Sequence, residues 1–374
     1  MTLAIEQLRE QIDQLDIQLV ELLAQRQEVT TAVGQYKKEV GKPIYDPVRE
    51  AELIKERRAL AESLNVSPDL IEDLLRRMIR ESYQTQHNAY RSVLPSQSKI
   101  VIVGGGGALG KRFVDMFERS TYRVEVIEKD DWSQAESIVK DAKLVIVAVP
   151  IKLTEQVIKL LPALPDDCVL ADLTSLKDAP LKAMLAKHSG PVVGLHPMFG
   201  PDVPNFVKQV VVACDGRFPE QYEWLIEQIT IWGAVIQKDD AKQHDSSMEL
   251  IQAMRHFTTF VYGKFLANQD PDLEHLLRLS SPIYRLELAM TGRLFAQDAN
   301  LYADIIFGAE NSKTLADKFK YELDSAIELL EQSDKFGFKQ QFEDVAAWFG
   351  KKSNEFLTES RAMLKTAQDS RDLK

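Results

Sequence analysis

The sequence predicts a multidomain chain with an all-α part first, an α/β part in the middle and a second all-α part at the end. Three observations predict it. The 374 residues exceed the usual size of one domain. Short apolar runs alternate with helical patterns in the middle, and both flanking stretches keep helical periodicity. We place the parts at 1–90, 99–238 and 239–374, with a linker at 91–98.

Composition and charge exclude several classes of protein. The net charge is −11 and no basic tract stands out, so we expect no nucleic-acid partner. No stretch approaches the roughly 18 consecutive apolar residues of a membrane helix, and the charged N-terminus does not resemble a signal peptide. Both cysteines, Cys168 and Cys214, fall in apolar strand-like runs. We therefore expect no membrane partner, no disulfide framework and a cytoplasmic location.

The first predicted helix, from about Thr2 to Val40, carries cations in its apolar seam. Apolar residues recur in steps of three and four from Leu8 to Leu22, and Arg26 and Lys37 follow on the same face. A cation in such a stripe is costly to desolvate, so this helix either buries an ion pair or lines a site for an anionic ligand. At about 55 Å it is too long to be covered by its own domain, which favours a homodimer.

Two shorter helices complete the first part. The second starts near Pro47, and the third has Ser67 as its N-cap and Pro68 in its first turn. An apolar stripe on the third helix turns polar partway along. Its successive positions are Ile71, Leu75, Met78, Ser82 and Gln86.

A glycine loop follows the first predicted strand, Lys99–Val103. Its glycines fill a G-x-G-x-x-G frame that opens a helix, and a second strand ends in Glu128, where an acid binds the ribose 2′-hydroxyl of NAD. The pattern predicts a Rossmann-type dinucleotide site for NAD, with a glycine-rich structural turn as the alternative. The expected cofactor contacts are Gly105, Gly106, Gly107, Ala108, Leu109, Gly110, Glu128, Val149 and Pro150.

His196 follows the apolar run Val192–Leu195, so we expect it at the carboxyl end of a strand. Ligands bind at this edge of an open α/β sheet, and a histidine accepts protons near neutral pH. A structural histidine is the alternative, but the glycine loop upstream favours a catalytic one. No pair of histidines has metal-ligand spacing with supporting cysteines or carboxylates, so we predict no metal site.

Two arginines lie on one line of a predicted helix in the last part. Ser281 and Pro282 form its N-cap and first turn, and Arg285, Ala289 and Arg293 follow one another at i, i+4 and i+8. This line is either a solvated face or a clamp for carboxylates, which the guanidinium fork matches.

The whole chain resembles the bifunctional chorismate mutase/prephenate dehydrogenase family of tyrosine biosynthesis. The shared runs are LLAQR at 22–26, PIYDPVRE at 43–50, PDLIEDLLRR at 68–77, GLHPMFGPD at 194–202 and SSPIYRLELAMTGRLFAQD at 280–298. The resemblance implies an intertwined dimer of three-helix mutase domains, then a Rossmann-type NAD domain, then a helical dimerisation domain. It implies chorismate and prephenate as substrates.

For the mutase, the resemblance implies a site made mostly of cations. It places Arg26, Arg49 and the partner subunit's Arg9 on the substrate carboxylates, and Lys37 and Gln86 on the ether oxygen. Glu50 and Ser82 would contact the region of the ring hydroxyl. Asp46 departs from the pattern, since relatives can carry an apolar residue there, and it adds a charge near the site.

For the dehydrogenase, the resemblance implies that His196 contacts the 4-hydroxyl of prephenate, with Ser175 sharing this contact and Arg293 on a carboxylate. The product would be 4-hydroxyphenylpyruvate. Further substrate contacts would be Lys177, His188, His256 and Arg285. The family is commonly inhibited by tyrosine, and His256 and Tyr302 are the positions that we expect to take part.

Two other functions fit parts of the sequence. The same dehydrogenase fold could act on arogenate, whose amine would require a carboxylate partner that the sequence does not place. A dimerising helical module joined to a nucleotide-sensing domain, without turnover, would also contain a helical seam and a glycine loop. The joint presence of Arg26, Lys37, Gln86, His196 and Arg293 argues against this second alternative.

Overall fold

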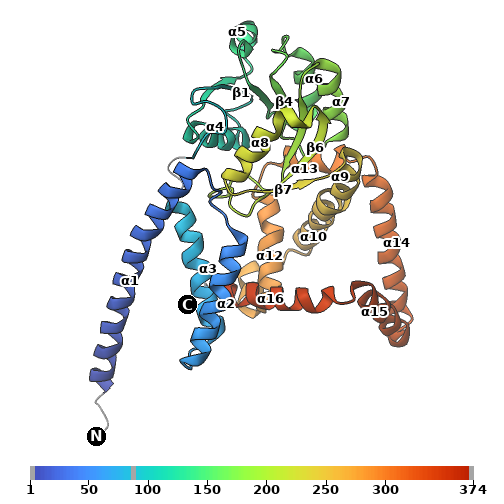
Figure 1. Cartoon of the computed structure of the whole chain (residues 1–374). Helices are drawn as coiled ribbons and strands as arrows, with labels where there is room; N and C mark the ends of the chain where they lie inside the picture. The colour runs from blue at the N-terminus through green and yellow to red at the C-terminus, as the bar shows by residue number, and fades with distance from the viewer. Residues whose placement is uncertain (1–4, 86–89, 370–374) are drawn as a thin grey trace. The chain divides into compact units, whose positions relative to one another are not determined.

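The computed structural model describes residues 5–85 and 90–369 and divides into two compact units, Met1–His244 and Asp245–Lys374 (Figure 1). The first unit holds a helical segment and an α/β segment. Among the described residues of the second unit only helices occur. The predicted succession of an all-α, an α/β and an all-α part is confirmed.

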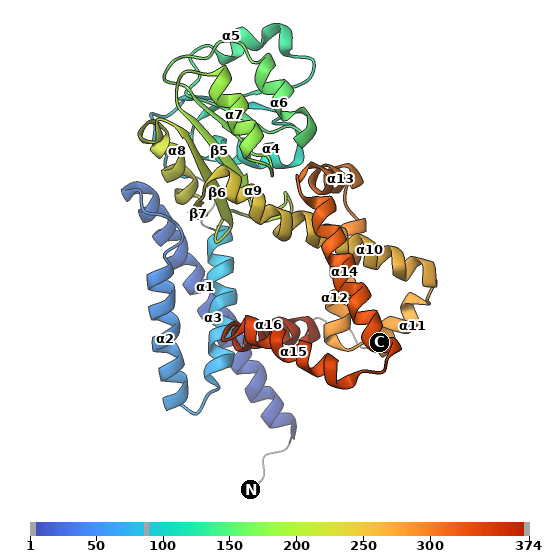
Figure 2. The same cartoon turned by 90° about the vertical axis from the view of Figure 1, so that its right-hand side faces the viewer.

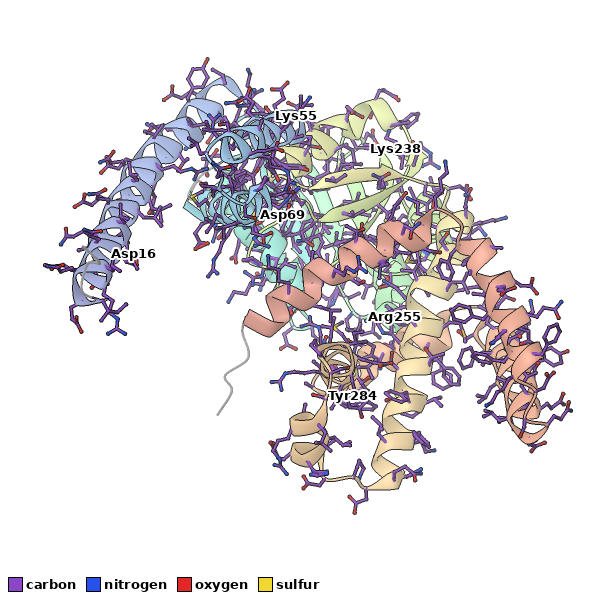
Figure 3. All side chains as sticks on the ribbon, turned by 90° about the horizontal axis from the view of Figure 1, so that it is seen from below. Asp16, Lys55, Asp69, Lys238, Arg255 and Tyr284 are labelled. Atoms are coloured by element: carbon purple, nitrogen blue, oxygen red, sulfur yellow. The ribbon has the colours of Figure 1, made fainter. Side chains whose placement is uncertain are left out.

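Three helices form the start of the first unit: α1 (Ile5–Val40), α2 (Pro47–Ser63) and α3 (Pro68–Thr85). The predicted N-cap of α3 is present, since the Ser67 hydroxyl accepts a hydrogen bond from the backbone amide of Leu70 at 3.3 Å. Helix α1 buries none of its residues, and its side chains, Asp16 among them, project freely along its outer part (Figure 3).

A seven-stranded sheet occupies the middle of the chain, where the short apolar runs alternate with helical patterns. In chain order its strands are β1 (Lys99–Val103), β2 (Arg123–Ile127), β3 (Leu144–Val147), β4 (Val169–Asp172), β5 (Val192–Pro197), β6 (Val210–Arg217) and β7 (Val235–Lys238). The order across the sheet is β2-β1-β3-β4-β5-β6-β7. Strands β1 to β5 are parallel, and β6 pairs antiparallel with β5.

The register aligns the carboxyl ends of the parallel strands in one row. Val103 pairs with Ile127 and Val147, Val147 pairs with Asp172, and Asp172 pairs with Gly194. The segments that leave these strands therefore meet at a single edge, where open α/β sheets bind ligands.

Helices cover both faces of the sheet. One face packs against α4 (Ala108–Arg119) and α8 (Pro219–Ile231). The other packs against α5 (Ala135–Val139), which follows the short turn η1 (Trp132–Gln134), and against α6 (Ile151–Leu160) and α7 (Asp178–Lys187). Helices α6 and α7 lie side by side in both Figure 1 and Figure 2.

The core on the α4 and α8 face also contains residues of the first helical segment. Ile44, Ile79 and Tyr83 are at most 8% exposed and belong to the same buried cluster as Ile100 and Phe113. The three-helix segment and the sheet thus share one continuous apolar core, which explains why they form a single compact unit.

The boundary between the two units falls within helix α9 (Ala241–Met248). After the end of α9, the second unit contains a π-helix η2 (Glu249–Met254), α10 (Arg255–Gln269), α11 (Leu273–Leu279), α12 (Pro282–Phe295), α13 (Ala299–Gly308), α14 (Ser312–Glu331), α15 (Lys335–Phe349) and α16 (Lys352–Asp369). The predicted cap of α12 is confirmed, since Ser281 accepts from the amide of Tyr284 at 3.3 Å. Within 5–85 and 90–369, no helix is long and apolar enough to span a bilayer.

Candidate active sites

The first candidate site is a pocket of about 130 Å³ among the three N-terminal helices. Five of the predicted mutase residues line it together. They are Arg26, Lys37, Arg49, Glu50 and Ser82. Arg9 lies on the exposed surface of α1 and does not line this pocket, and Gln86 lies outside the described residues.

The contacts of Arg26 distinguish between a buried ion pair and a site for an anionic ligand, the two roles that its place in the apolar seam allows. Its guanidinium donates to the hydroxyl oxygen of Ser82 at 2.9 Å and to the carbonyl oxygen of Met78 at 3.4 Å. Among the described residues no carboxylate forms an ion pair with it. Partial burial lowers the pKa of Arg26. The arginine is thus held by neutral groups, which leaves its charge available to an anionic ligand.

Lys37 is also held by a neutral group. Its ammonium donates to the carbonyl oxygen of Ile44 at 2.7 Å, and burial lowers the pKa of Lys37 while the charge of Asp46 partly offsets this. The Asp46 side chain accepts from the backbone amide of Arg49 at 3.0 Å and so caps α2. The unexpected acid therefore has a structural role at the helix start.

Glu50 is the buried acid of the pocket. Its side chain is 8% exposed, and one carboxylate oxygen accepts from the phenol of Tyr83 at 3.1 Å. The other oxygen accepts from the ammonium of Lys208, which belongs to the loop between β5 and β6. The sequence did not indicate Tyr83 or Lys208 as partners of Glu50. They are 33 and 158 residues away along the chain, and no helix or strand periodicity links positions so far apart.

The second candidate site is a pocket of about 310 Å³ at the carboxyl edge of the sheet, beside β1 and β2. Of the predicted cofactor residues, Gly107, Glu128, Val149 and Pro150 line it. The Glu128 carboxylate accepts from the amide of Gly106 at 2.6 Å, so the acid lies directly against the glycine loop.

Neighbouring atoms lie so close to two glycines of this loop that a larger side chain would not fit. A Cβ at Gly110 would lie 2.4 Å from the carbonyl oxygen of Gly104, and one at Gly105 would lie 2.8 Å from the side chain of Val126. Gly107 caps α4, and a Cβ there would meet only the carbonyl oxygen of Gly104, at 3.2 Å. The loop therefore packs tightly on one side and presents the start of α4 to a phosphate on the other.

The third candidate site surrounds His196, farther along the same edge. His196 is 2% exposed, and its Nδ1 lies 2.8 Å from Nε2 of His244 in α9. Burial lowers the pKa of His196 well below its ordinary value, and the charges of Lys177 and His244 lower it further. A histidine held in this way stays neutral and able to accept a proton.

A buried ion pair lies beneath this histidine. The ammonium of Lys177 donates to the carboxylate of Asp172 at 2.5 Å and to the carbonyl oxygen of Leu195 at 2.7 Å, and both charged side chains are fully buried. Burial raises the pKa of Asp172, and Lys177 partly offsets the effect. Lys177 thus holds the strand that carries His196, and its direct contact with substrate stays a prediction.

The other predicted residues divide between the two edges. Ser175 follows β4 at the carboxyl edge and is half-buried. His188 lies at the opposite edge, where its Nε2 is 2.7 Å from the carbonyl oxygen of Cys168, just before β4 begins. The structure therefore does not bring His188 to the candidate site. His244 and Asp172 were missed, although an acid that ends a buried strand is a signal for Asp172.

A small pocket of about 30 Å³ lies within the second unit. It brings together the predicted residues His256, Arg293 and Tyr302, and the rings of His256 and Tyr302 meet edge to face at 4.8 Å between centroids. Burial and the charge of Arg255 lower the pKa of His256 to about 4. Arg285 is exposed on α12 and does not line this pocket.

Three family models match consecutive parts of the chain. Residues 8–87 match chorismate mutase type II, residues 118–237 match the nucleotide-binding domain of prephenate dehydrogenase, and residues 240–345 match the prephenate dehydrogenase dimerisation domain. The second match starts after the glycine loop, so the loop itself is supported by its geometry and not by this model.

Two relatives are similar over nearly the full length of the chain. The T-protein of Enterobacter agglomerans is 53% identical and the match covers 97% of this chain and 98% of that protein. The T-protein of Haemophilus influenzae is 50% identical, with 98% of each chain covered. The fold of prephenate dehydrogenase from A. aeolicus matches with a TM-score of 0.54 at 16% identity, covering 68% of this chain and 98% of that one.

Proposed function

The chain belongs to the T-protein family of bifunctional chorismate mutase/prephenate dehydrogenases in tyrosine biosynthesis, and from this premise we propose how its residues carry out the two reactions. The mutase rearranges chorismate to prephenate. The dehydrogenase then oxidises and decarboxylates prephenate to 4-hydroxyphenylpyruvate. The observation that carries the proposal is a set of partly buried cations held by neutral groups in one pocket.

In the mutase site, Arg26 and Arg49 bind the two carboxylates of chorismate, together with the partner subunit's Arg9. Lys37 and Gln86 donate to the ether oxygen, and Glu50 and Ser82 contact the region of the ring hydroxyl. The rearrangement is concerted and needs no acid, base or nucleophile. Negative charge grows on the ether oxygen as the C–O bond breaks, so cations already fixed there stabilise the transition state more than the ground state.

The nucleotide of the dehydrogenase is NAD. The start of α4 would hold the pyrophosphate, and Glu128 would accept from a ribose hydroxyl in place of the amide of Gly106. A carboxylate at this position also disfavours a 2′-phosphate. The A. aeolicus neighbour of the same fold is described in complex with NAD+. When bound, the nicotinamide supplies the hydride acceptor.

In the dehydrogenase, neutral His196 accepts the proton of the 4-hydroxyl of prephenate. Its Nδ1 lies 2.8 Å from Nε2 of His244, and we assign the proton transfer to its other ring nitrogen, with Ser175 sharing the hydroxyl contact. Withdrawal of this proton assists oxidation at C4, and loss of the ring carboxylate as CO₂ makes the ring aromatic. Arg293 orients a substrate carboxylate, and His256 and Arg285 add weaker contacts.

The residues of the small pocket favour prephenate over arogenate. None of the eight residues that line it is acidic, whereas the amine of arogenate calls for a carboxylate partner. A relative in Methanocaldococcus jannaschii, 31% identical over 67% of this chain, is named a probable arogenate/prephenate dehydrogenase, so both substrates belong in the assay.

We also propose a homodimer in which α1 packs against a second copy. Large apolar side chains of α1 remain exposed, including Ile12 at 56%, Leu15 at 62% and Leu22 at 60%. Pairing would cover them and bring Arg9 of the partner subunit to the mutase pocket.

Feedback by tyrosine and a cytoplasmic location complete the proposal. Tyrosine carries the phenol and carboxylate that His256, Tyr302 and Arg293 would recognise in the small pocket. Cys168 and Cys214 are buried thiols and form no disulfide, which suits a reducing compartment.

A two-stage assay tests the proposed function. Purified protein is given chorismate without NAD, and NAD is added after the first reaction has finished. We expect prephenate alone in the first stage, and NADH with 4-hydroxyphenylpyruvate in the second. Prephenate that yields neither product on addition of NAD would contradict the proposed dehydrogenase, and a faster rate with arogenate would change its substrate.

A further inference from the structure

A lysine of the nucleotide-binding segment reaches into the mutase segment. The ammonium of Lys208, in the loop between β5 and β6, lies 2.5 Å from one carboxylate oxygen of Glu50 in α2. The same ammonium lies 5.2 Å from the ring centroid of Tyr45, in the turn before α2. Lys208 thus contacts two neighbouring elements of the mutase segment.

The carboxylate that Lys208 contacts lines the mutase pocket and has little access to water. Glu50 is 8% exposed, while its other cation, Arg76, stands 3.7 Å away and is itself 50% exposed. Tyr83 donates to the second oxygen. A buried carboxylate depends on such partners for its charge and for its orientation, and Lys208 is the nearest cation.

The backbone of Lys208 is fixed in a conformation that lysine rarely adopts. Its φ is +63°, in the left-handed region, and its amide donates to the carbonyl oxygen of Gly233 at 2.9 Å. The two preceding residues, Phe206 and Val207, are buried in the core. A strained backbone that is anchored by its own amide and by the buried residues before it holds the side chain in one place.

The shared core makes this contact a stable one. Ile44, Ile79 and Tyr83 of the mutase segment are buried in the cluster that covers the α4 and α8 face of the sheet. The loop with Lys208 and the pocket with Glu50 are therefore attached to the same packed core, and their relative position is set by that packing.

We propose that Lys208 is a positioning residue of the mutase site, so that the nucleotide-binding segment supplies part of the mutase machinery. Lys208 orients the Glu50 carboxylate toward the ring hydroxyl of chorismate and does not touch the substrate itself. The inference rests on the proposed role of Glu50 in the mutase site. It makes mutase activity depend on the neighbouring segment even when no NAD or prephenate is bound.

A double-mutant cycle in the full-length protein tests the inference. The variants are Lys208→Met, Glu50→Gln and the double variant, assayed for chorismate turnover. We expect Lys208→Met to lower mutase kcat/KM roughly tenfold, mainly through kcat, and to have less than a twofold effect when Glu50 is already Gln. Lys208→Arg keeps a cation near the carboxylate and should restore most of the rate.

Two controls separate positioning from folding. Lys238→Met removes a lysine of β7 whose ammonium lies 3.7 Å from Asp215, and it should leave the mutase unchanged (Figure 3). Prephenate oxidation by Lys208→Met, measured in the same preparation, should stay within twofold of the parent and so report an intact nucleotide-binding segment.

Results that differ from these expectations contradict either the positioning role of Lys208 or the proposed role of Glu50. An unchanged mutase in Lys208→Met, or an equal loss in the parent and in the Glu50→Gln background, refutes positioning through Glu50. An unchanged mutase in Glu50→Gln refutes the proposed role of Glu50 itself. A parallel loss of both activities in Lys208→Met assigns the lysine to folding.

Discussion

The charged groups of the mutase pocket and those at the sheet edge around His196 have opposite kinds of partner. In the pocket, Arg26 and Lys37 keep their charges and are held by neutral oxygens. At the sheet edge, the ion pair of Asp172 and Lys177 is compensated internally, and the histidine above it is kept neutral. A fixed charge suits a reaction in which charge only shifts, and a neutral base suits one in which a proton must leave.

His196→Asn should separate the two sites most clearly. Asparagine keeps a polar side chain but cannot accept the proton, so we expect prephenate oxidation to fall by about three orders of magnitude. The mutase should be unaffected. NADH formation and chorismate disappearance measure the two rates, and an unchanged rate of NADH formation would remove His196 from the mechanism.

Lys37→Ala is the complementary change. It removes the ammonium proposed for the ether oxygen, so mutase kcat should fall by about 10²-fold to 10³-fold, as when an oxyanion donor is lost. Prephenate oxidation should persist. If both activities fall together while circular dichroism stays that of the folded protein, the two sites are not separate in the way that the comparison assumes.

The two reactions should also differ in their dependence on pH. Because the pKa of His196 is lowered well below 6.5, the histidine stays neutral as the pH falls through the ordinary range of histidine. The acid limb of dehydrogenase kcat/KM should therefore lie below pH 6.5. The mutase should show no limb of its own from a histidine. A dehydrogenase limb at or above pH 6.5 would contradict the burial of a neutral base.

The smallest effects are expected at the caps of the two helices that carry site residues. Asp46→Ala and Ser281→Ala each remove a cap of α2 or α12 and should lower the free energy of unfolding by about 1 kcal/mol. Urea unfolding measures both. Only Asp46→Ala should also change the mutase rate, since it removes a charge near Lys37. Equal mutase rates in both variants would limit Asp46 to its capping role.

Local patterns predicted most of the fold. The apolar runs Lys99–Val103 and Val192–Leu195 became strands, and Ser67 and Ser281 became caps, because apolar runs, helical period and capping chemistry act within a few residues. The glycine loop and Glu128 were also predictable, since their contact follows from one strand–loop–helix unit.

The parts of the sites that depend on distant contacts could not be predicted. His196 and His244 meet across 48 residues, and Glu50 and Lys208 across 158, with no periodicity that links them. His188 follows a helix, but the structure places it at the amino edge of the sheet. Its place before β5, not after a strand, is readable from the order of the elements, and the expected substrate contact came from the family resemblance instead.

The apolar core shared by the three N-terminal helices and the sheet has a consequence for any natural or engineered fission of the gene. Two products cut between these segments would each expose to water apolar side chains of the cluster that now buries Ile44, Ile79 and Tyr83 together with residues of the sheet segment. Newly exposed apolar surface of this kind favours aggregation, so separation would carry a cost that is independent of any catalytic gain from one chain.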